Sequence, residues 1–193
     1  LLKERETKGL RVERFMSAES GVVHRAGTVV IVGRPNVGKS TLFNRLLRTK
    51  LSIVSAKPQT TRYRIVGVLT GEGYQAVFID TPGAMRRTAD ELDRQMQREI
   101  QSAVEEADVT VLLVEPRPPG QTERFLVGVM AAHGYPSLLA INKIDSVRKP
   151  ALLPLIETYS GLPPFAEIVP ISARTGDGVG LLLERTVACL PEG

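Results

Sequence analysis

Residues Gly33 to Ser40 read GRPNVGKS, a glycine-rich segment that ends in a lysine and a serine. This spacing matches the G-x-x-x-x-G-K-[ST] pattern of a phosphate-binding loop, or P-loop. The backbone N–H groups of such a loop, together with the start of the next helix, surround an anion. The ammonium of Lys39 is expected to reach the β- and γ-phosphates, and the hydroxyl of Ser40 is expected to bind Mg²⁺. The segment therefore predicts a site for a nucleoside triphosphate with its metal ion.

A second motif, DTPG, follows an apolar run and spans residues Asp80 to Gly83. The same four residues also make an ordinary turn, so the motif alone is a weak signal. Its place at a strand end, some forty residues after the P-loop, strengthens it. We expect the Asp80 carboxylate to hold the Mg²⁺ shell through a water molecule, because Mg²⁺ keeps several of its waters. The backbone N–H of Gly83 is then placed to contact a γ-phosphate.

A third motif, NKID, spans Asn142 to Asp145, and a fourth, ISA, ends at Ala173. The Asp145 carboxylate can accept two parallel hydrogen bonds from the N1–H and 2-amino groups of guanine, a donor pair that adenine lacks. Asn142 is expected to brace the loops and the base edge, and the stem of Lys143 to cover a base face. The backbone N–H of Ala173 can bond guanine O6. These motifs predict selection of guanine.

Strands and helices alternate along the chain, and this order predicts an α/β fold with helices on both faces of a mostly parallel sheet. The loops at the carboxyl ends of such strands converge, so the motifs should meet there. The turn GEG between two strands predicts an antiparallel edge hairpin. Strands are expected over 28–32, 62–70, 74–80, 109–114, 137–142 and 167–172, and helices over 39–48, 89–107, 122–132, 149–159 and 179–190.

Composition limits the class of protein. The 193 residues, 42% hydrophobic and 24% charged, fit one globular domain, and a net charge of +4 permits a polyanionic partner without requiring one. No apolar run approaches the ~20 residues of a membrane span. The single cysteine, Cys189, excludes an internal disulfide and is interpreted as a core residue, and His24 and His133 lack metal-ligand spacing. Residues 1–26, poor in apolar side chains, are expected to be a disordered tail before a domain over 27–191.

The four motifs, in this order, resemble the TRAFAC class of P-loop GTPases over residues 28–190. The finer resemblance is to the Era family of bacterial GTPases, through GRPNVGKSTLFNRLL, KLSIVSAKPQTTRYRIVGV, YQAVFIDTPG and the final LPEG. It implies a P-loop NTPase three-layer αβα sandwich whose six-stranded, mostly parallel sheet carries one antiparallel edge strand. It also implies a Mg²⁺-dependent GTPase that cycles between GTP and GDP forms.

The resemblance assigns roles to individual residues. The polar run 53–62 corresponds to a switch in which Thr61, with Thr60 as the alternative, binds the metal ion beside Ser40 and Asp80. Asn36, Lys39, Thr61 and Gly83 form the implied catalytic group. The implied nucleotide-binding residues are Gly33, Arg34, Pro35, Asn36, Val37, Gly38, Lys39, Ser40, Thr41, Asp80, Thr81, Pro82, Gly83, Ala84, Asn142, Lys143, Ile144, Asp145, Ser172, Ala173 and Arg174.

One departure from the pattern of many GTPases concerns catalysis. Ala84 stands where they carry a glutamine that orients the attacking water. The backbone near Thr61 is one substitute for this glutamine, because it can hold the attacking water. The other is K⁺: Asn36 matches the asparagine that helps bind K⁺ in related GTPases, and K⁺ can supply the charge of an arginine finger. A GTP-gated binding module with negligible hydrolysis is the alternative that this departure leaves open.

The resemblance also implies partners. Era-type proteins act in the bacterial cytoplasm in 16S rRNA processing and 30S subunit assembly, with possible peripheral association at the inner membrane. They bind RNA through a C-terminal KH domain, which is expected to be absent here, so RNA contact is expected to be weak. A tandem-domain ribosome assembly GTPase and a tRNA-modifying GTPase are alternatives, against which KPQTTR argues. Contact with RNA phosphates is a second choice, after a solvated helix face, for Arg86, Arg87, Arg94 and Arg98.

Overall fold

In the part of the chain that the structure describes, six strands form one sheet, in the order β2-β3-β1-β4-β5-β6. The structure, a computed structural model, describes residues 24–49, 64–80, 89–162 and 165–193. All neighbouring strands are parallel except β2 and β3. The strands are β1 (Arg25–Val32), β2 (Arg64–Gly71), β3 (Tyr74–Asp80), β4 (Val109–Val114), β5 (Ser137–Ile141) and β6 (Phe165–Pro170). The predicted fold class, including the antiparallel edge strand, is confirmed.

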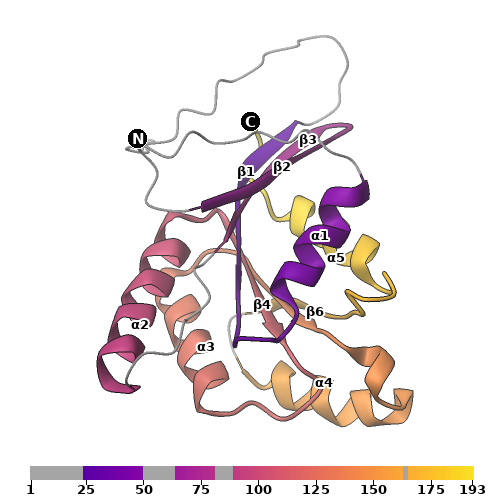
Figure 1. Ribbon diagram of the computed structural model, residues 1–193. Coiled ribbons are helices and arrows are strands. Elements are labelled where there is room, and N and C mark those ends of the chain that lie inside the picture. Colours follow the sequence, from indigo (N-terminus) through magenta and orange to yellow (C-terminus); the bar gives the residue numbers. More distant parts are fainter. Residues whose placement is uncertain (1–23, 50–63, 81–88, 163–164) are drawn as a thin grey trace.

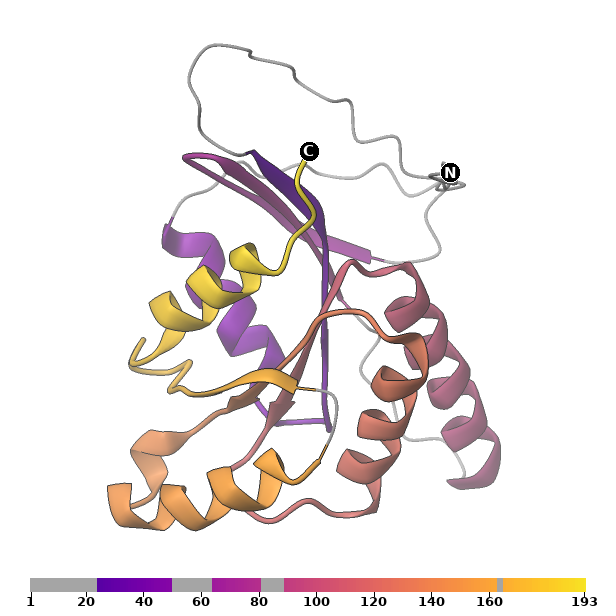
Figure 2. The ribbon, with the colours of Figure 1, turned by 180° about the vertical axis from the view of Figure 1, so that it is seen from behind.

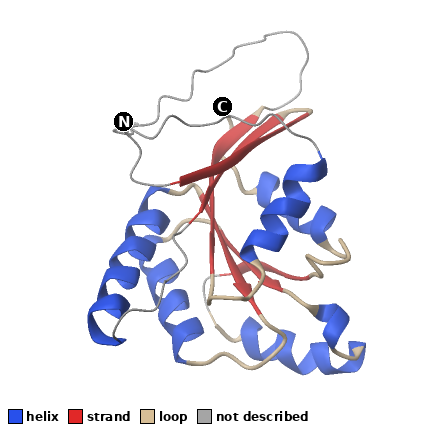
Figure 3. Ribbon diagram, viewed as in Figure 1, coloured by secondary structure: helices blue, strands red, loops and turns tan. Residues whose placement is uncertain are grey.

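Helices cover both faces of the sheet (Figures 1 and 2). One face carries α1 (Lys39–Thr49) and α5 (Val179–Ala188). The opposite face carries α2 (Ala89–Glu106), α3 (Gln121–His133) and α4 (Leu152–Ser160). Figure 3 shows the resulting three layers, with the strands between the two sets of helices.

The two core clusters follow from the alternation of side chains along each strand. In β1, Val29 and Ile31 pack toward α1 and α5, while Val30 and Val32 pack toward α2 and α3. All six residues of β4 are buried, because helices cover both of its faces. The strands that carry the site are therefore fixed by apolar contacts on two sides.

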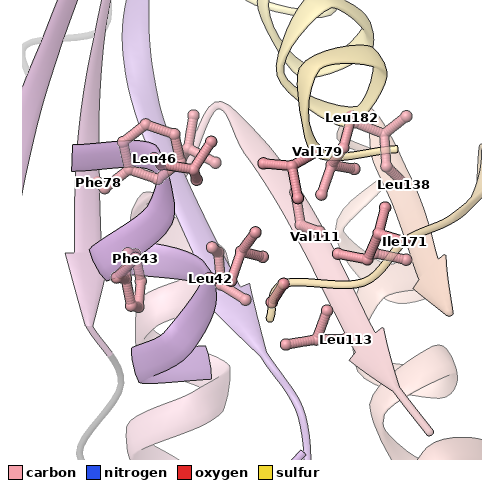
Figure 4. Close-up of a cluster of buried hydrophobic side chains, with 14 of the residues drawn as sticks. Leu42, Phe43, Leu46, Phe78, Val111, Leu113, Leu138, Ile171, Val179 and Leu182 are labelled. Atoms are coloured by element: carbon pink, nitrogen blue, oxygen red, sulfur yellow. The ribbon is translucent and has the colours of Figure 1, made fainter. Parts of the chain in front are cut away.

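Figure 4 shows the cluster beneath α1 and α5, which anchors the helix that follows the P-loop. Leu42, Phe43 and Leu46 are buried on one side of α1. The ring of Phe43 meets that of Phe78 on β3 edge to face, with centroids 6.1 Å apart. This packing holds the first turn of α1 against the sheet edge where the motifs lie.

Several element boundaries differ from the predicted ones. β1 begins at Arg25, inside the segment expected to be a tail, because Arg25 pairs with Tyr74 of β3. β6 ends at Pro170, so the ISA motif follows the strand and does not end it. The predicted helix 149–159 is a 3₁₀ turn (Lys149–Ala151) followed by α4. The rest of the expected tail, residues 1–23, lies outside the described residues.

The end of α5 also differs from the prediction. The helix ends at Ala188, two residues before the predicted end, and its buried residues are Val179, Leu182 and Thr186. Cys189 follows the helix and is partly buried against the α1–α5 cluster, and burial raises the pKa of its thiol. None of the described helices is long and apolar enough to cross a bilayer.

Candidate nucleotide-binding site

The P-loop lies between β1 and α1, at the carboxyl edge of the sheet. Its path depends on glycine at two places. A Cβ on Gly33 would collide with the carbonyl oxygen of Leu113 on β4. Gly38 has a φ of 107°, and a Cβ there would collide with the amide of Asn142. The loop is thus packed against two neighbouring segments through positions where no side chain fits.

Lys39 folds back over the loop that precedes it. Its Nζ donates to the carbonyl of Gly33 at 2.9 Å and to that of Arg34 at 3.0 Å. These contacts hold the ammonium at the mouth of the backbone cradle, where a polyphosphate would lie. Lys39 therefore stands where the sequence predicted a phosphate-binding cation.

Asn142 joins three segments. It follows β5 and is 2% exposed. Its Nδ2 donates to the carbonyl of Val37 in the P-loop at 2.8 Å, and its Oδ1 accepts the N–H of Ala173 at 2.9 Å. These two hydrogen bonds are the contacts that the predicted role of Asn142, a brace between loops, requires. The N–H of Ala173, predicted to bond a base oxygen, donates instead to Asn142 in this structure.

Lys143 links the NKID loop to the P-loop from the other side. Its backbone is left-handed, with φ 64°, and its Nζ donates to the carbonyl of Asn36 at 2.8 Å. The same Nζ lies 2.5 Å from Oε1 of Glu115, which follows β4. The hydrogen bond from Lys143 is the main cause of the lowered pKa of Glu115. Glu115 was not singled out from the sequence, where only its place after an apolar strand marks it.

The carboxylate of Asp145 has a defined partner on each oxygen. Oδ1 accepts the hydroxyl of Ser172 at 2.6 Å, and Oδ2 lies 2.6 Å from Nη2 of Arg174. The Ser172 hydrogen bond, helped by the charge of Arg174, lowers the pKa of Asp145. The group is therefore an ionised acceptor at neutral pH.

Arg45 is a second residue that sequence reasoning missed. It lies on α1, and its Nε donates to the carbonyl of Ala173 at 3.3 Å, while its Nη2 donates to the carbonyl of Arg174. It therefore ties the helix after the P-loop to the ISA loop. No sequence signal distinguishes it from the other arginines of the chain.

These contacts enclose a pocket of about 360 Å³ at the edge of the sheet. One side belongs to the P-loop and α1, and the other to the two loops after β5 and β6. The pocket is lined by Gly38, Thr41, Asn142, Lys143, Asp145, Ser146, Ala173 and Arg174. Such a site can hold a planar polar base against a carboxylate, next to an anion cradle.

Comparison with known proteins identifies the family of this chain. The sequence model of the family described as 50S ribosome-binding GTPase matches residues 28–143. The chain belongs to this GTPase family. It is 45% identical over 170 residues to the GTPase Era of Lactobacillus delbrueckii subsp. bulgaricus, covering 88% of this chain and 56% of that protein. It is 48% identical over 170 residues to the GTPase Era of Geobacter metallireducens, covering 88% and 57%. The predicted resemblance to the Era family is confirmed.

Solved structures of this GTPase family agree with the fold. A variant of Aquifex aeolicus Era bound to GDP and AlF4⁻ superposes with a TM-score of 0.71 at 38% identity, covering 88% of this chain and 58% of that one. Era in complex with MgGDPNP and nucleotides 1506–1542 of 16S ribosomal RNA gives a TM-score of 0.72 at the same identity and coverage. The chain spans a little over half the length of the curated relatives it matches.

A GTPase of this family implies Mg²⁺, and the residue types at the predicted metal positions fit that ion. Ser40 is the second residue of α1, and Asp80 ends β3, where it pairs with Ile31 of β1 next to the P-loop. Hydroxyl and carboxylate oxygens are the hard donors that Mg²⁺ prefers. Two groups of predicted site residues lie outside the described residues: Thr60 and Thr61, and Thr81, Pro82, Gly83 and Ala84.

The arginines considered for RNA contact are divided in the same way. Arg98 lies on α2 with an exposed side chain. Arg86 and Arg87 lie outside the described residues, as does the side chain of Arg94.

Proposed function

We propose that this chain binds GTP and GDP and hydrolyses GTP with Mg²⁺ as a molecular switch. The observation that carries the proposal is the placement of Asp145 in one pocket with the P-loop. An ionised carboxylate beside an anion cradle matches a ligand with a donor-rich base at one end and phosphates at the other.

Each part of the pocket has a task in this proposal. The N–H groups at the start of α1 and the Lys39 ammonium bind the phosphates. The carbonyls of Gly33 and Arg34 hold that ammonium in place. Asp145 selects guanine, and the hydrogen bond from the Ser172 hydroxyl orients the Asp145 carboxylate. Ser40 and Asp80 would hold Mg²⁺, which would neutralise charge on the β- and γ-phosphates.

The attacking water needs an orienting group, and Ala84 has none to offer. We assign this task to the backbone around Thr61 and Gly83. Asn36, at the exposed tip of the P-loop, is assigned to a K⁺ ion beside the phosphates. The assignments of Thr61 and Gly83 rest on the family resemblance alone.

Phosphate release from GTP under multiple-turnover conditions, with Mg²⁺ and K⁺, tests the activity. The unaltered chain should turn over slowly, and Lys39→Ala should abolish turnover. Lys149→Ala removes an equal charge from an exposed 3₁₀ turn and should leave the rate unchanged. GTP binding without phosphate release would favour the GTP-gated binding module instead, and absence of GTP binding would contradict both functions.

We further propose that the switch acts in 16S rRNA processing and assembly of the 30S subunit in the bacterial cytoplasm. The relatives named Era and the solved complex of Era with 16S ribosomal RNA support this role. The test is co-sedimentation of the chain with purified 30S subunits in the presence of a non-hydrolysable GTP analogue or of GDP. Nucleotide-dependent co-sedimentation supports the role, and equal recovery without 30S subunits contradicts it. Contact with a membrane surface stays a prediction.

A further inference from the structure

The carboxylate that selects the base is already engaged by a side chain of the same protein. Nη2 of Arg174 lies 2.6 Å from Oδ2 of Asp145. The Ser172 hydroxyl occupies Oδ1 at 2.6 Å. Both oxygens that a guanine base would use thus have a protein donor in this structure.

The donor on Oδ2 is chemically equivalent to the guanine edge. Guanine presents N1–H and its 2-amino group on one carbon, and these three atoms with N3 form a guanidine unit. The guanidinium of arginine presents the same planar fork of N–H donors to a carboxylate. Arg174 therefore offers Asp145 the interaction that the base would offer.

The surroundings of Arg174 let its side chain leave while its backbone stays. The side chain is 77% exposed, whereas that of Asp145 is 19% exposed. The carbonyls of Ala173 and Arg174 are held by the Arg45 guanidinium, so the loop does not depend on the ion pair. An exposed pair of this kind is weak enough to be displaced by a bound ligand.

We propose that Arg174 is an internal competitor for the base site: its guanidinium occupies Asp145 in the nucleotide-free protein and is displaced by guanine. The proposal rests on the proposed function of the pocket. It makes Arg174 a residue that sets the rate of nucleotide entry, since the binding-competent form is the fraction in which the ion pair is open. It does not require any movement of the P-loop.

Stopped-flow association of GDP carrying a fluorescent group on its ribose tests the proposal, with the nucleotide-stripped chain and Mg²⁺. Arg174→Ala should raise the association rate constant about two- to five-fold, the range expected for loss of an exposed ion pair. Arg174→Lys keeps the charge without the planar fork. Its association rate constant should lie between those of the unaltered chain and of Arg174→Ala. Arg124→Ala removes a charge from an exposed position on α3 and should match the unaltered chain.

The sign of the change decides between competing accounts. If the Arg174 charge attracted the nucleotide, Arg174→Ala would associate more slowly, and if Arg174 only covered the bound base, the variant would release GDP faster with unchanged association. Either result overturns the proposal. GDP binding by the unaltered chain with no gain in Arg174→Ala overturns this inference alone, whereas absence of GDP binding by the unaltered chain overturns the proposed function with it.

Discussion

The ammonium of Lys143 lies 2.8 Å from the backbone carbonyl of Asn36, although 107 residues separate them in the chain. This contact joins the loop that carries Asp145 to the loop that would hold the phosphates. Glu115, which follows β4, accepts a hydrogen bond from the same ammonium. The loop that carries Asp145 and the P-loop are thus connected by side-chain contacts. A substitution in one loop should therefore change nucleotide binding at the other.

Asn142 should contribute strongly to stability as well as to binding. Asn142→Ala leaves the Val37 carbonyl and the Ala173 N–H without their buried partner. We expect the free energy of unfolding to fall by about 2–4 kcal/mol, since each unsatisfied buried group costs about 1–3 kcal/mol. Urea unfolding followed by circular dichroism measures it. Asn44→Ala, at an exposed position of α1, should change stability by less than about 0.5 kcal/mol.

Glu115 should act on nucleotide release through Lys143. Glu115→Ala removes the partner of the Lys143 ammonium. We expect GDP to dissociate about two- to five-fold faster, because the side chains are partly exposed and the pair is correspondingly weak. Displacement of fluorescent GDP by excess unlabelled GDP measures the rate. Glu167→Ala, which breaks an ion pair with Arg185 on α5, is the control, and equal dissociation in both variants would refute a special role for Glu115.

Acid should destabilise the protein through Glu115 and Asp145. Both pKa values are lowered in the folded state, the first mainly by Lys143 and the second mainly by Ser172. Their contribution is therefore complete above the ordinary values of 4.5 and 3.8 and is lost as pH falls through the lower folded values. Urea midpoints measured from neutral pH to about pH 3 should fall less steeply for Glu115→Gln than for the unaltered chain. If the urea midpoints of the two proteins fell equally as pH is lowered, this contribution of Glu115 would be contradicted.

Asp145→Asn should change the preferred base. The amide no longer offers two acceptors to guanine N1–H and the 2-amino group, but its NH₂ can donate to the 2-oxo group of xanthine. We expect GDP affinity to fall by at least ~100-fold and xanthosine diphosphate affinity to rise, because an unmatched polar site rejects its ligand strongly. Competition against fluorescent GDP measures both. Retained preference for GDP would remove Asp145 from the base site.

Potassium should accelerate hydrolysis through Asn36. This residue is exposed and has a φ of 63°, so Asn36→Gly removes the side chain without a conformational penalty. Phosphate release should be faster in K⁺ than in Na⁺ for the unaltered chain and independent of the cation in Asn36→Gly. Equal rates of the unaltered chain in the two salts would exclude a K⁺ site.

Much of this protein is legible in its sequence. Residue types and spacing alone predicted the P-loop, since Gly33, Gly38 and Lys39 stand in the G-x-x-x-x-G-K pattern. The contacts that exclude a side chain at the two glycines come from Leu113 and Asn142 and belong to the tertiary structure. The alternation of apolar runs and amphipathic segments determined a mostly parallel sheet, and therefore that the loops after β1, β5 and β6 share one edge. Element ends were less well predicted, as β1 and β6 show, because pairing with neighbouring strands decides where a strand begins and stops.

Only the tertiary structure decided the contacts between those loops. Glu115 with Lys143, Arg45 with Ala173, and Arg174 with Asp145 pair side chains or carbonyls from different elements. The Ala173 N–H, which the sequence pattern assigned to guanine O6, donates to Oδ1 of Asn142. Spacing along the chain cannot reveal such pairs, because strand order and the packing of α1 and α5 bring them within hydrogen-bonding distance. The residue types indicate which chemistry is possible, and the three-dimensional packing determines which residues contact one another.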